Sequence, residues 1–341
     1  MTLSSETSPR SLLARLGPFI ALILVFLFFA VFDSVRNGKR AAFLTPRNLQ
    51  TVAIQTSPII VAGLGMTLII ISGGIDLSAG TAIALCATVL AQRLEAGSDP
   101  GESVLLAILC GSLVGAVNGT LISKLRVVPF IITLGTMTVS LGLAKILARE
   151  TTIRPPLDKI PNWLSDLYAG VCFSCDLNIG SFQLPISIPT GALIAVLLSL
   201  AISGILRWTV FGRHLYAIGS NETAARLCGI NVTLLKIALY SFAGLFIGIA
   251  GIYQFSKITS GSPTSGVGME LRIIAAVVIG GASLEGGRGN VLGTICGALI
   301  MSVISNGCTH LNVSNPLQDI ILGLIIITAV SIDQLRQRRR N

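Results

Sequence analysis

Charged residues are scarce in this chain. Only 11% of its 341 residues are Asp, Glu, Lys or Arg, whereas a soluble globular domain carries about 25%. Hydrophobic residues make up 52% of the sequence, and the mean hydropathy is +0.82. This balance excludes an ordinary soluble domain and predicts a protein that lies largely in membrane lipid.

The motifs of common enzymes are also missing. The sequence contains no Walker A motif, no G-x-S-x-G and no H-E-x-x-H, so nothing indicates a P-loop for ATP, a serine nucleophile or a metalloprotease site. The two histidines, His214 and His310, have no neighbours in sequence that suggest catalysis. We therefore predict no catalytic residues, no enzyme activity and no cofactor.

Cysteine patterns typical of metal sites are absent as well. Four of the seven cysteines stand in apolar runs, where a thiol usually packs as a small hydrophobic group. The close pair Cys172 and Cys175 has no second pair to complete a zinc site, so no metal is predicted. A local disulfide between these two residues is possible if their loop is extracytoplasmic, and the sequence leaves this open.

Long apolar runs fill most of the chain. Many approach the about 20 residues that cross a bilayer as a helix. We predict an all-α polytopic membrane protein of about ten transmembrane helices that forms a single domain over residues 1–341. The expected spans are 16–32, 52–71, a third that ends near 94, 103–123, 129–147, 190–206, 237–255, 271–284, 291–310 and 317–332, of which 271–284 is short enough to be a half-helix.

Basic residues orient these spans. If the chain starts inside the cell, the basic clusters in 124–126, 207–236 and 336–340 all fall on the cytoplasmic side, as the positive-inside rule requires. Both termini are then cytoplasmic, and the Pro-containing segment 148–189 is an exposed extracytoplasmic loop. The basic residues in 33–48 conflict with this orientation and are outvoted by the other clusters. The net charge of +9 is thus explained by topology, and no nucleic acid partner is predicted.

The most polar interval in the second half of the chain, 207–236, contains a short helix with both ends marked. Asn221 can accept a hydrogen bond from a backbone N–H as the N-cap. Gly229 can adopt the left-handed conformation that ends a helix. The residues assigned to this helix are Asn221, Glu222, Ala224, Ala225, Arg226 and Gly229.

Two glycine-rich segments form a weak internal repeat. GGIDLSAG at 73–80 and GGASLEGG at 280–287 match when Gly73 is aligned with Gly280, although chance similarity between glycine-rich segments explains this equally well. Asp76 is interpreted as a helix cap near the cytoplasmic surface that bonds the N–H of Ala79 or Gly80, rather than as a polar site inside the membrane. The positions assigned to this motif are Gly73, Gly74, Asp76, Gly80, Gly280, Gly281, Gly286 and Gly287.

Four segments, in order along residues 50–300, resemble one protein family. They are GMTLIIISGGIDLSAG (65–80), VPFIITLGTM (128–137), GRHLYAIGSNETAARLCGINV (212–232) and GGASLEGGRGNVLGTICGALI (280–300). The family comprises the permease subunits of ribose-, xylose-, arabinose- and galactoside-type bacterial ABC importers. The resemblance implies a type II-like permease fold in the bacterial inner membrane.

The same resemblance implies partners. These are an ABC ATPase on the cytoplasmic side, a second permease subunit, identical or different, and a periplasmic sugar-binding protein that delivers the substrate. The short helix near 221–228 would dock on the ATPase and transmit its closure. The wider importer pattern has Glu-Ala-Ala where this chain has Glu-Thr-Ala-Ala at 222–225, so the role of Glu222 stays open.

Polar residues within the spans could line a path for a neutral, hydroxyl-rich substrate, with helix–helix hydrogen bonding as the alternative for each. The candidates are Thr67, Asn118, Thr133, Thr136, Thr138, Ser302 and Asn306. Two other functions remain open. A related ABC permease could carry branched-chain amino acids, and an ion-coupled secondary carrier would need intramembrane acids for which the sequence offers no convincing cluster. The sequence does not reveal which sugar is carried.

Overall fold

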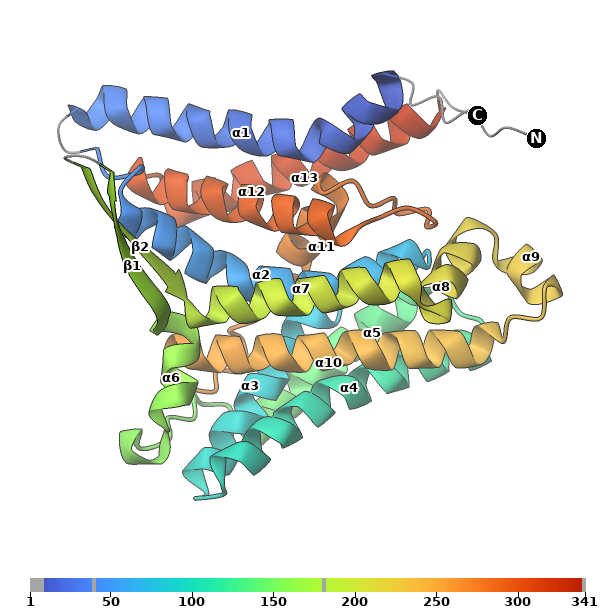
Figure 1. The fold of residues 1–341 in the computed structure, drawn as a ribbon. Coiled ribbons are helices and arrows are strands. Elements are labelled where there is room, and N and C mark those ends of the chain that lie inside the picture. The colour runs from blue at the N-terminus through green and yellow to red at the C-terminus, as the bar shows by residue number, and fades with distance from the viewer. Residues whose placement is uncertain (1–8, 39–40, 180–181, 339–341) are drawn as a thin grey trace.

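The structure is a computed structural model that describes residues 9–38, 41–179 and 182–338 and consists mainly of helices (Figure 1). The helices are α1 Pro9–Asn37, α2 Pro46–Ile71, α3 Ala79–Glu95, α4 Pro100–Leu125, α5 Pro129–Leu147, α6 Asn162–Ala169, α7 Thr190–Trp208, α8 Val210–Ser220, α9 Glu222–Leu227, α10 Val232–Ile258, α11 Met269–Ile279, α12 Val291–His310 and α13 Asn315–Arg338.

Within the described part of the chain, 7 helices are long and apolar enough to cross a membrane, namely α1, α2, α4, α5, α7, α10 and α12. The other expected spans are shorter. Helix α3 has 17 residues and α11 has 11, and the apolar part of α13 is confined to Asn315–Thr328. The span expected at 271–284, which the sequence allows to be a half-helix, corresponds to α11, which begins at Met269 and ends at Ile279, where a glycine-rich turn follows.

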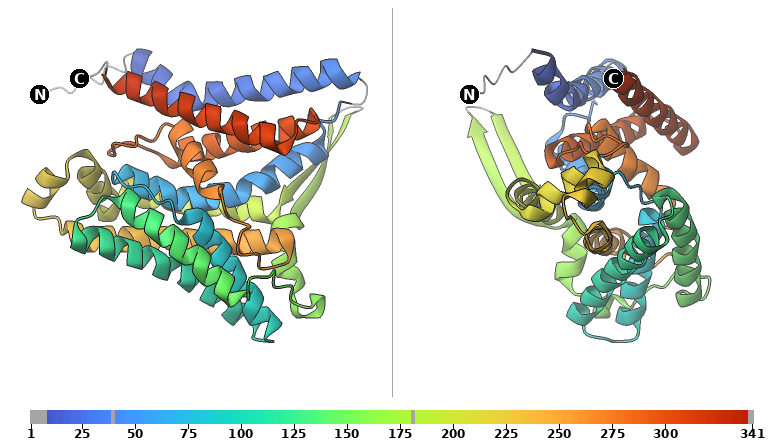
Figure 2. Two further views of the ribbon diagram at one scale, coloured as in Figure 1. Left: turned by 180° about the vertical axis from the view of Figure 1, so that it is seen from behind. Right: turned by 90° about the vertical axis from the view of Figure 1, so that its right-hand side faces the viewer.

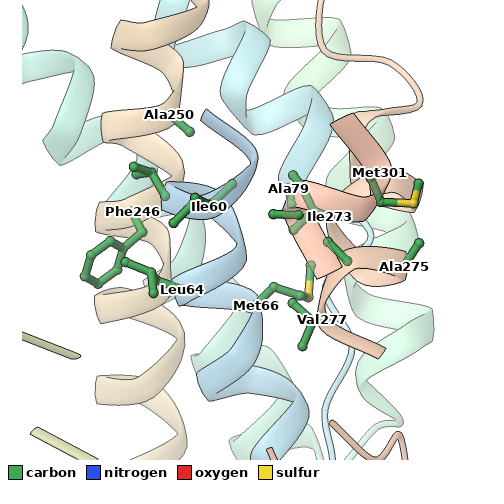
Figure 3. Packing of buried hydrophobic residues seen from close by; sticks show 14 of the residues in the cluster. Ile60, Leu64, Met66, Ala79, Phe246, Ala250, Ile273, Ala275, Val277 and Met301 are labelled. Carbon is green, nitrogen blue, oxygen red and sulfur yellow. The ribbon is translucent and has the colours of Figure 1, made fainter. Parts of the chain in front are cut away.

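Helix α2 forms the centre of the bundle. Its apolar residues cover the whole circumference, which is typical of a helix that is enclosed by others. In the apolar window of α2, 83% of the residues are buried, against 17% in α1. Leu64 packs toward Phe246 of α10, while Met66 lies beside Ile273 and Val277 of α11 (Figure 3). Helix α1 lies at one edge of the bundle, and α5 lies on the face opposite α7 (Figure 2).

Helices α4 and α10 pack backbone to backbone. Gly111, Gly115 and Gly119 repeat every four residues on one face of α4. A Cβ atom at Gly111 would lie 2.5 Å from the carbonyl oxygen of Gly244, and one at Gly115 would collide with the carbonyl oxygen of Tyr240. Apolar helices gain little hydrophobic free energy by associating in lipid, so this close approach of small residues supplies the packing contacts instead.

The two ends of the bundle differ. Helices α8 and α9 lie at one end, where α1 also begins and α13 also ends, and α6 lies at the other end with a β-hairpin (Figure 1). In the hairpin, β1 Val171–Ile179 pairs antiparallel with β2 Phe182–Pro189, with Ile179 opposite Phe182. The all-α prediction is wrong for this segment. Cys172 is a free, exposed cysteine, so the optional disulfide is not formed.

We expect Gly115→Ala to destabilise the fold by about 1–3 kcal/mol, because the added methyl group meets backbone atoms that have no rotamer to change. The matched control is Gly135→Ala in α5, where nothing lies within 4 Å of the added Cβ. This control should gain stability, since Ala is favoured over Gly inside a helix. Melting temperatures of the purified variants in detergent would measure both effects, and equal shifts would contradict the packing described here.

Candidate functional site

Helix α9 follows α8 after one residue, and its start is fixed by that residue. Asn221 is the N-cap, and its side-chain oxygen accepts a hydrogen bond from the N–H of Ala224 at 2.9 Å. This bond satisfies one of the N–H groups that a helix leaves unpaired at its first turn. The predicted N-cap is therefore confirmed.

The end of α9 is fixed as well. Gly229 has a φ of 86°, in the left-handed region. Its N–H donates to the carbonyl of Arg226 at 3.1 Å, and the N–H of Ile230 donates to the carbonyl of Ala225 at 3.2 Å. These two bonds are the Schellman motif of a helix C-terminus. The predicted role of Gly229 as the terminating residue is confirmed.

Most of α9 is displayed rather than packed. Ala225 is buried in a small cluster with Ile218 and Val232. Ala224 is exposed, and Leu227 is 85% exposed. A short helix that is anchored through one alanine and presents an apolar side chain at the end of the bundle is suited to contact another protein.

Glu222 braces α9 against α10. Its carboxylate accepts hydrogen bonds from Arg226 at 3.0 Å and from Lys236 of α10 at 2.7 Å. Partial burial raises the pKa of Glu222. The hydrogen bonds and positive charges of Lys236 and Arg226 together lower it by more, so the pKa lies below the ordinary value. Because the folded-state pKa is depressed, the stabilisation is present above the unfolded pKa and is lost as the pH falls through the folded value. The brace therefore operates at neutral pH.

Helix α8 touches the core of the bundle through Gly219. A Cβ atom at Gly219 would collide with the carbonyl oxygen of Ile71, the last residue of α2, and would lie 2.5 Å from the nitrogen of Gly287. The N–H of Gly287 donates to that same carbonyl at 2.8 Å. The hydroxyl of Tyr216 donates to the carbonyl of Gly289 at 2.8 Å. We call this contact of α8 with the end of α2 and with loop 280–290 the junction.

The sequence analysis does not single out Gly219 or Tyr216, although both lie in the segment 212–232 that carries the family resemblance. The sequence did contain one indication of this contact, namely the glycine at position 219. Glycine lowers helix stability, so a glycine inside a helix suggests a close packing contact.

The two glycine-rich segments end helices in the same way. Gly73 has a φ of 80° and follows the C-cap of α2, and Gly281 has a φ of 94° and follows the C-cap of α11. The equivalent positions are therefore Gly73 and Gly281, and the predicted alignment of Gly73 with Gly280 is wrong by one residue. Gly80 lies within α3, whereas Gly287 lies in a turn with a φ of 70°.

The remaining motif glycines allow close contacts. A Cβ atom at Gly74 would collide with the hydroxyl of Tyr240, and one at Gly280 with the backbone of Gly293 in α12. A Cβ atom at Gly286 would lie 2.7 Å from the carbonyl oxygen of Gly219. The last contact places the motif directly at the junction.

Asp76 is buried and does not make the predicted bonds. The residue is 1% exposed. Its Oδ1 accepts hydrogen bonds from the N–H of Ser78 at 2.8 Å and from the Ser78 hydroxyl at 2.6 Å. The amide of Asn118 in α4 donates to the Ser78 oxygen at 2.9 Å. The predicted bonds to the N–H of Ala79 or Gly80 are therefore wrong, and the N-cap of α3 is Ser78. Asp76 instead anchors loop 72–78 to α4.

Several candidate path residues belong to helix contacts. The Thr67 hydroxyl lies 2.6 Å from that of Thr294, and Thr133 donates to the carbonyl of Ile75 at 3.3 Å. Thr136 and Thr138 donate to carbonyls of their own helix, α5. Together with the bond that Asn118 makes to Ser78, these contacts favour the alternative of helix–helix and local hydrogen bonding.

Asn306 and Ser302 line a cavity of about 860 Å³. The cavity lies between α2, the end of α10, the loop before α11, α11 itself, α12 and α13. Asn306 and Asn48 exchange amide hydrogen bonds of 2.9 and 3.0 Å, and the Nε2 atom of His310 lies 2.9 Å from the Asn48 oxygen. Because the start of α2 and the end of α12 line this cavity, it lies toward the end of the bundle that carries the hairpin (Figure 1).

The structure also reveals a buried acid that the sequence analysis missed. Glu270, at the start of α11, is 6% exposed. Its Oε1 accepts from the N–H of Gly268 at 3.1 Å, while its Oε2 has no partner among the described residues. A Cβ atom at Gly80 would collide with that Oε2. This contact is the physical reason for glycine at the end of the first motif.

Comparison with known proteins assigns the chain to a family. A family model described as "Branched-chain amino acid transport system / permease component" matches residues 48–330. The chain belongs to this family. It is therefore a multi-pass membrane permease, and the predicted resemblance to importer permeases is confirmed.

The relatives of this permease include three sugar permeases. It is 36% identical to the ribose import permease protein RbsC of Bacillus subtilis, over 94% of this chain and 92% of the relative. It is 34% identical to the fructose import permease protein FrcC of Rhizobium meliloti, over 97% and 91%. It is 34% identical to the galactose/methyl galactoside import permease protein MglC of Escherichia coli, over 98% and 99%. No solved structure matches the chain.

Two substitutions of Asp76 distinguish a structural role of its hydrogen bonds from a role of its carboxylate in proton transfer. Asp76→Ala should destabilise the permease by roughly 1–3 kcal/mol for each buried donor that it leaves unpaired. Asp76→Asn keeps an acceptor oxygen for Ser78 and should retain most of the stability and activity. Melting temperature and transport would both be measured. A stable but inactive Asp76→Asn variant would show that the carboxylate itself is needed.

Proposed function

We propose that this chain is the permease subunit of an ATP-driven, binding-protein-dependent importer of monosaccharides. The observation that carries the proposal is the similarity over nearly the whole chain to relatives named as ribose, fructose and galactose import permeases. The family description names branched-chain amino acids, but the relatives named above carry sugars, and hydroxyl and amide groups are among those that line the cavity.

The proposed topology has ten crossings in one domain, with both chain ends in the cytoplasm and a type II-like fold in the bacterial inner membrane. Helices α3, α11 and α13 would complete the crossings that the longer helices begin. The basic residues near α8, α9 and the end of α4 support this orientation. Arg36, one of the basic residues that conflict with it, donates to the carbonyl of Leu311 at 2.7 Å and so satisfies the end of α12.

A partner ATPase would dock on α9 through the residues around Ala224 and Leu227. Movement of α9 would pass through α8 to the junction, where Gly219 meets the end of α2 and loop 280–290. Helices α2 and α12 both leave the junction region and line the cavity at their other ends. A second permease subunit would complete the pathway, and a periplasmic sugar-binding protein would deliver the substrate. The candidate path on this chain then reduces to the cavity around Asn306.

Reconstitution tests the function. The chain, its ATPase and candidate sugar-binding proteins would be placed in liposomes, and uptake of D-ribose, D-fructose, D-galactose and L-leucine would be measured with and without ATP. We expect uptake of a monosaccharide that requires ATP and the binding protein. Leucine uptake under the same conditions would support the amino acid alternative, and uptake by the lone chain driven by an ion gradient would overturn the importer assignment.

The end of α9 generates a second prediction. Gly229→Val should lower ATP-driven uptake at least several-fold while membrane insertion is retained, because a β-branched residue resists a positive φ. No neighbour lies within 4 Å of the added Cβ, so steric collision is not the cause. Gly229→Asn is the matched control and should transport nearly as well, since Asn tolerates this conformation. Equal activity of all three proteins would remove the proposed role of this helix end.

A further inference from the structure

We infer that the cavity-facing side of α12 is a monosaccharide-binding subsite within the permease itself, with the hydroxyl of Ser302 and the amide of Asn306 as its hydrogen-bonding groups. The inference rests on the proposed function and goes beyond it, because recognition by a separate binding protein does not require any sugar site in the membrane.

One face of α12 lines the cavity. The lining residues of this helix follow the helical period and are Met301, Ser302, Ser305, Asn306, Thr309 and His310. Residues at such spacing lie above one another on one side of a helix. All but Met301 are polar, whereas the rest of the helix is mainly apolar, with Thr294 as its other hydroxyl-bearing residue. Intramembrane polar groups are unfavourable unless they have partners or face a polar space. This face therefore has the composition of a wall that contacts a polar substrate.

The hydroxyl of Ser302 has unused hydrogen-bonding capacity. Ser302 is 3% exposed, and its Oγ has no hydrogen-bond partner among the described residues. Other buried hydroxyls in the bundle donate to the carbonyl four residues earlier, as Thr67 does at 2.6 Å, Thr88 at 2.8 Å and Ser199 at 2.7 Å. Ser302 does not make this bond. The oxygen itself is enclosed, so a ligand in the cavity would reach it after a rotation about χ1, and the unpaired hydroxyl would gain a hydrogen bond by that rotation.

The amide of Asn306 is held in a fixed orientation. Asn48 donates one N–H to the carbonyl of Phe43 at 2.8 Å and the other to Asn306 at 3.0 Å. The Asn48 oxygen must then be the acceptor for Asn306 at 2.9 Å and for the Nε2 proton of His310 at 2.9 Å. Asn306 spends one of its two side-chain N–H groups on Asn48. Its second N–H has no partner in the part of the chain that the structure describes, and it can donate to a sugar hydroxyl one helical turn from Ser302.

The charged side chains that line the cavity are those of Lys257, Arg272 and Asp319. The one carboxylate among the described lining residues is that of Asp319, and it pairs with Arg272 at 3.4 Å. A sugar needs no charged partner and can use the hydroxyl and amide groups of α12. Among the described residues that line the cavity, His310 is the one with an aromatic ring. Without a further ring for stacking, the subsite holds a sugar weakly, as passage through a permease requires.

The test uses the complete importer in liposomes and measures monosaccharide uptake per ATP hydrolysed. Ser302→Ala should lower this ratio about two- to tenfold, which corresponds to the loss of one hydrogen bond. The matched control is Ser199→Ala, which removes a hydroxyl that is 2% exposed, is paired with the Ala195 carbonyl and lies outside the cavity. It should leave uptake per ATP unchanged. Ser302→Thr keeps the hydroxyl and should restore most of the activity.

A series of singly deoxygenated sugars supplies a readout that a purely structural role of Ser302 would not move. For each sugar, uptake by wild type is divided by uptake by Ser302→Ala, which cancels the contribution of the binding protein. We expect this quotient to fall to about one for the analogue that lacks the contacted hydroxyl. The same quotient for every analogue, or Ser302→Ala activity equal to wild type, would overturn the subsite. If the wild-type importer transports no monosaccharide at all, the proposed function fails instead.

Discussion

Backbone contacts at glycine hold this membrane bundle together. The face of α4 that carries Gly111, Gly115 and Gly119 lies directly on the backbone of α10. Lipid tails are as apolar as leucine, so burial of apolar surface alone gives helices little reason to associate in a membrane. Close approach gains dispersion contacts that larger side chains would prevent. Gly219 and Gly287 repeat this principle at the junction, where three separate chain segments meet.

Polar groups inside the bundle follow a second constraint. A buried donor or acceptor without a partner is unfavourable. The Thr67 hydroxyl accordingly bonds a backbone carbonyl and the hydroxyl of Thr294, and the Ser199 hydroxyl bonds a backbone carbonyl. Asp76 belongs to the same class, because it accepts two hydrogen bonds from Ser78, whose hydroxyl oxygen in turn accepts one from Asn118. Against this background, five buried side-chain atoms have no partner among the described residues, and they belong to Arg93, Asn118, Tyr240, Glu270 and Ser302. Glu270 and Ser302 lie in α11 and α12, after α10.

The arrangement links one end of the molecule to the other. Helix α9 is held by the Glu222 brace to α10 and continues from α8, which meets the end of α2 at the junction. The opposite ends of α2, α10 and α12 surround the cavity. These contacts form a chain from α9 through α8 and α2 to the cavity, and in the proposed importer a displacement of α9 would pass along it. In the proposed importer, this route connects ATP hydrolysis on a partner chain with the polar wall of α12.

The features that depend on local hydrogen bonding or on composition could be predicted from the sequence. The caps of α9 at Asn221 and Gly229 involve residues only a few positions apart, and the long apolar runs that became α2, α4 and α10 identify spans by composition. The hairpin was missed, although apolar and polar residues alternate through 171–179 and 182–188, which is a pattern typical of strands. Tertiary structure alone decided which polar residues face a cavity. Thr67 and Asn306 are both polar residues within long apolar runs, and the sequence does not distinguish their roles. Their partners, Thr294 and Asn48, lie 227 and 258 residues away. Only the packing of distant helices therefore determines which side chains keep free hydrogen-bonding groups.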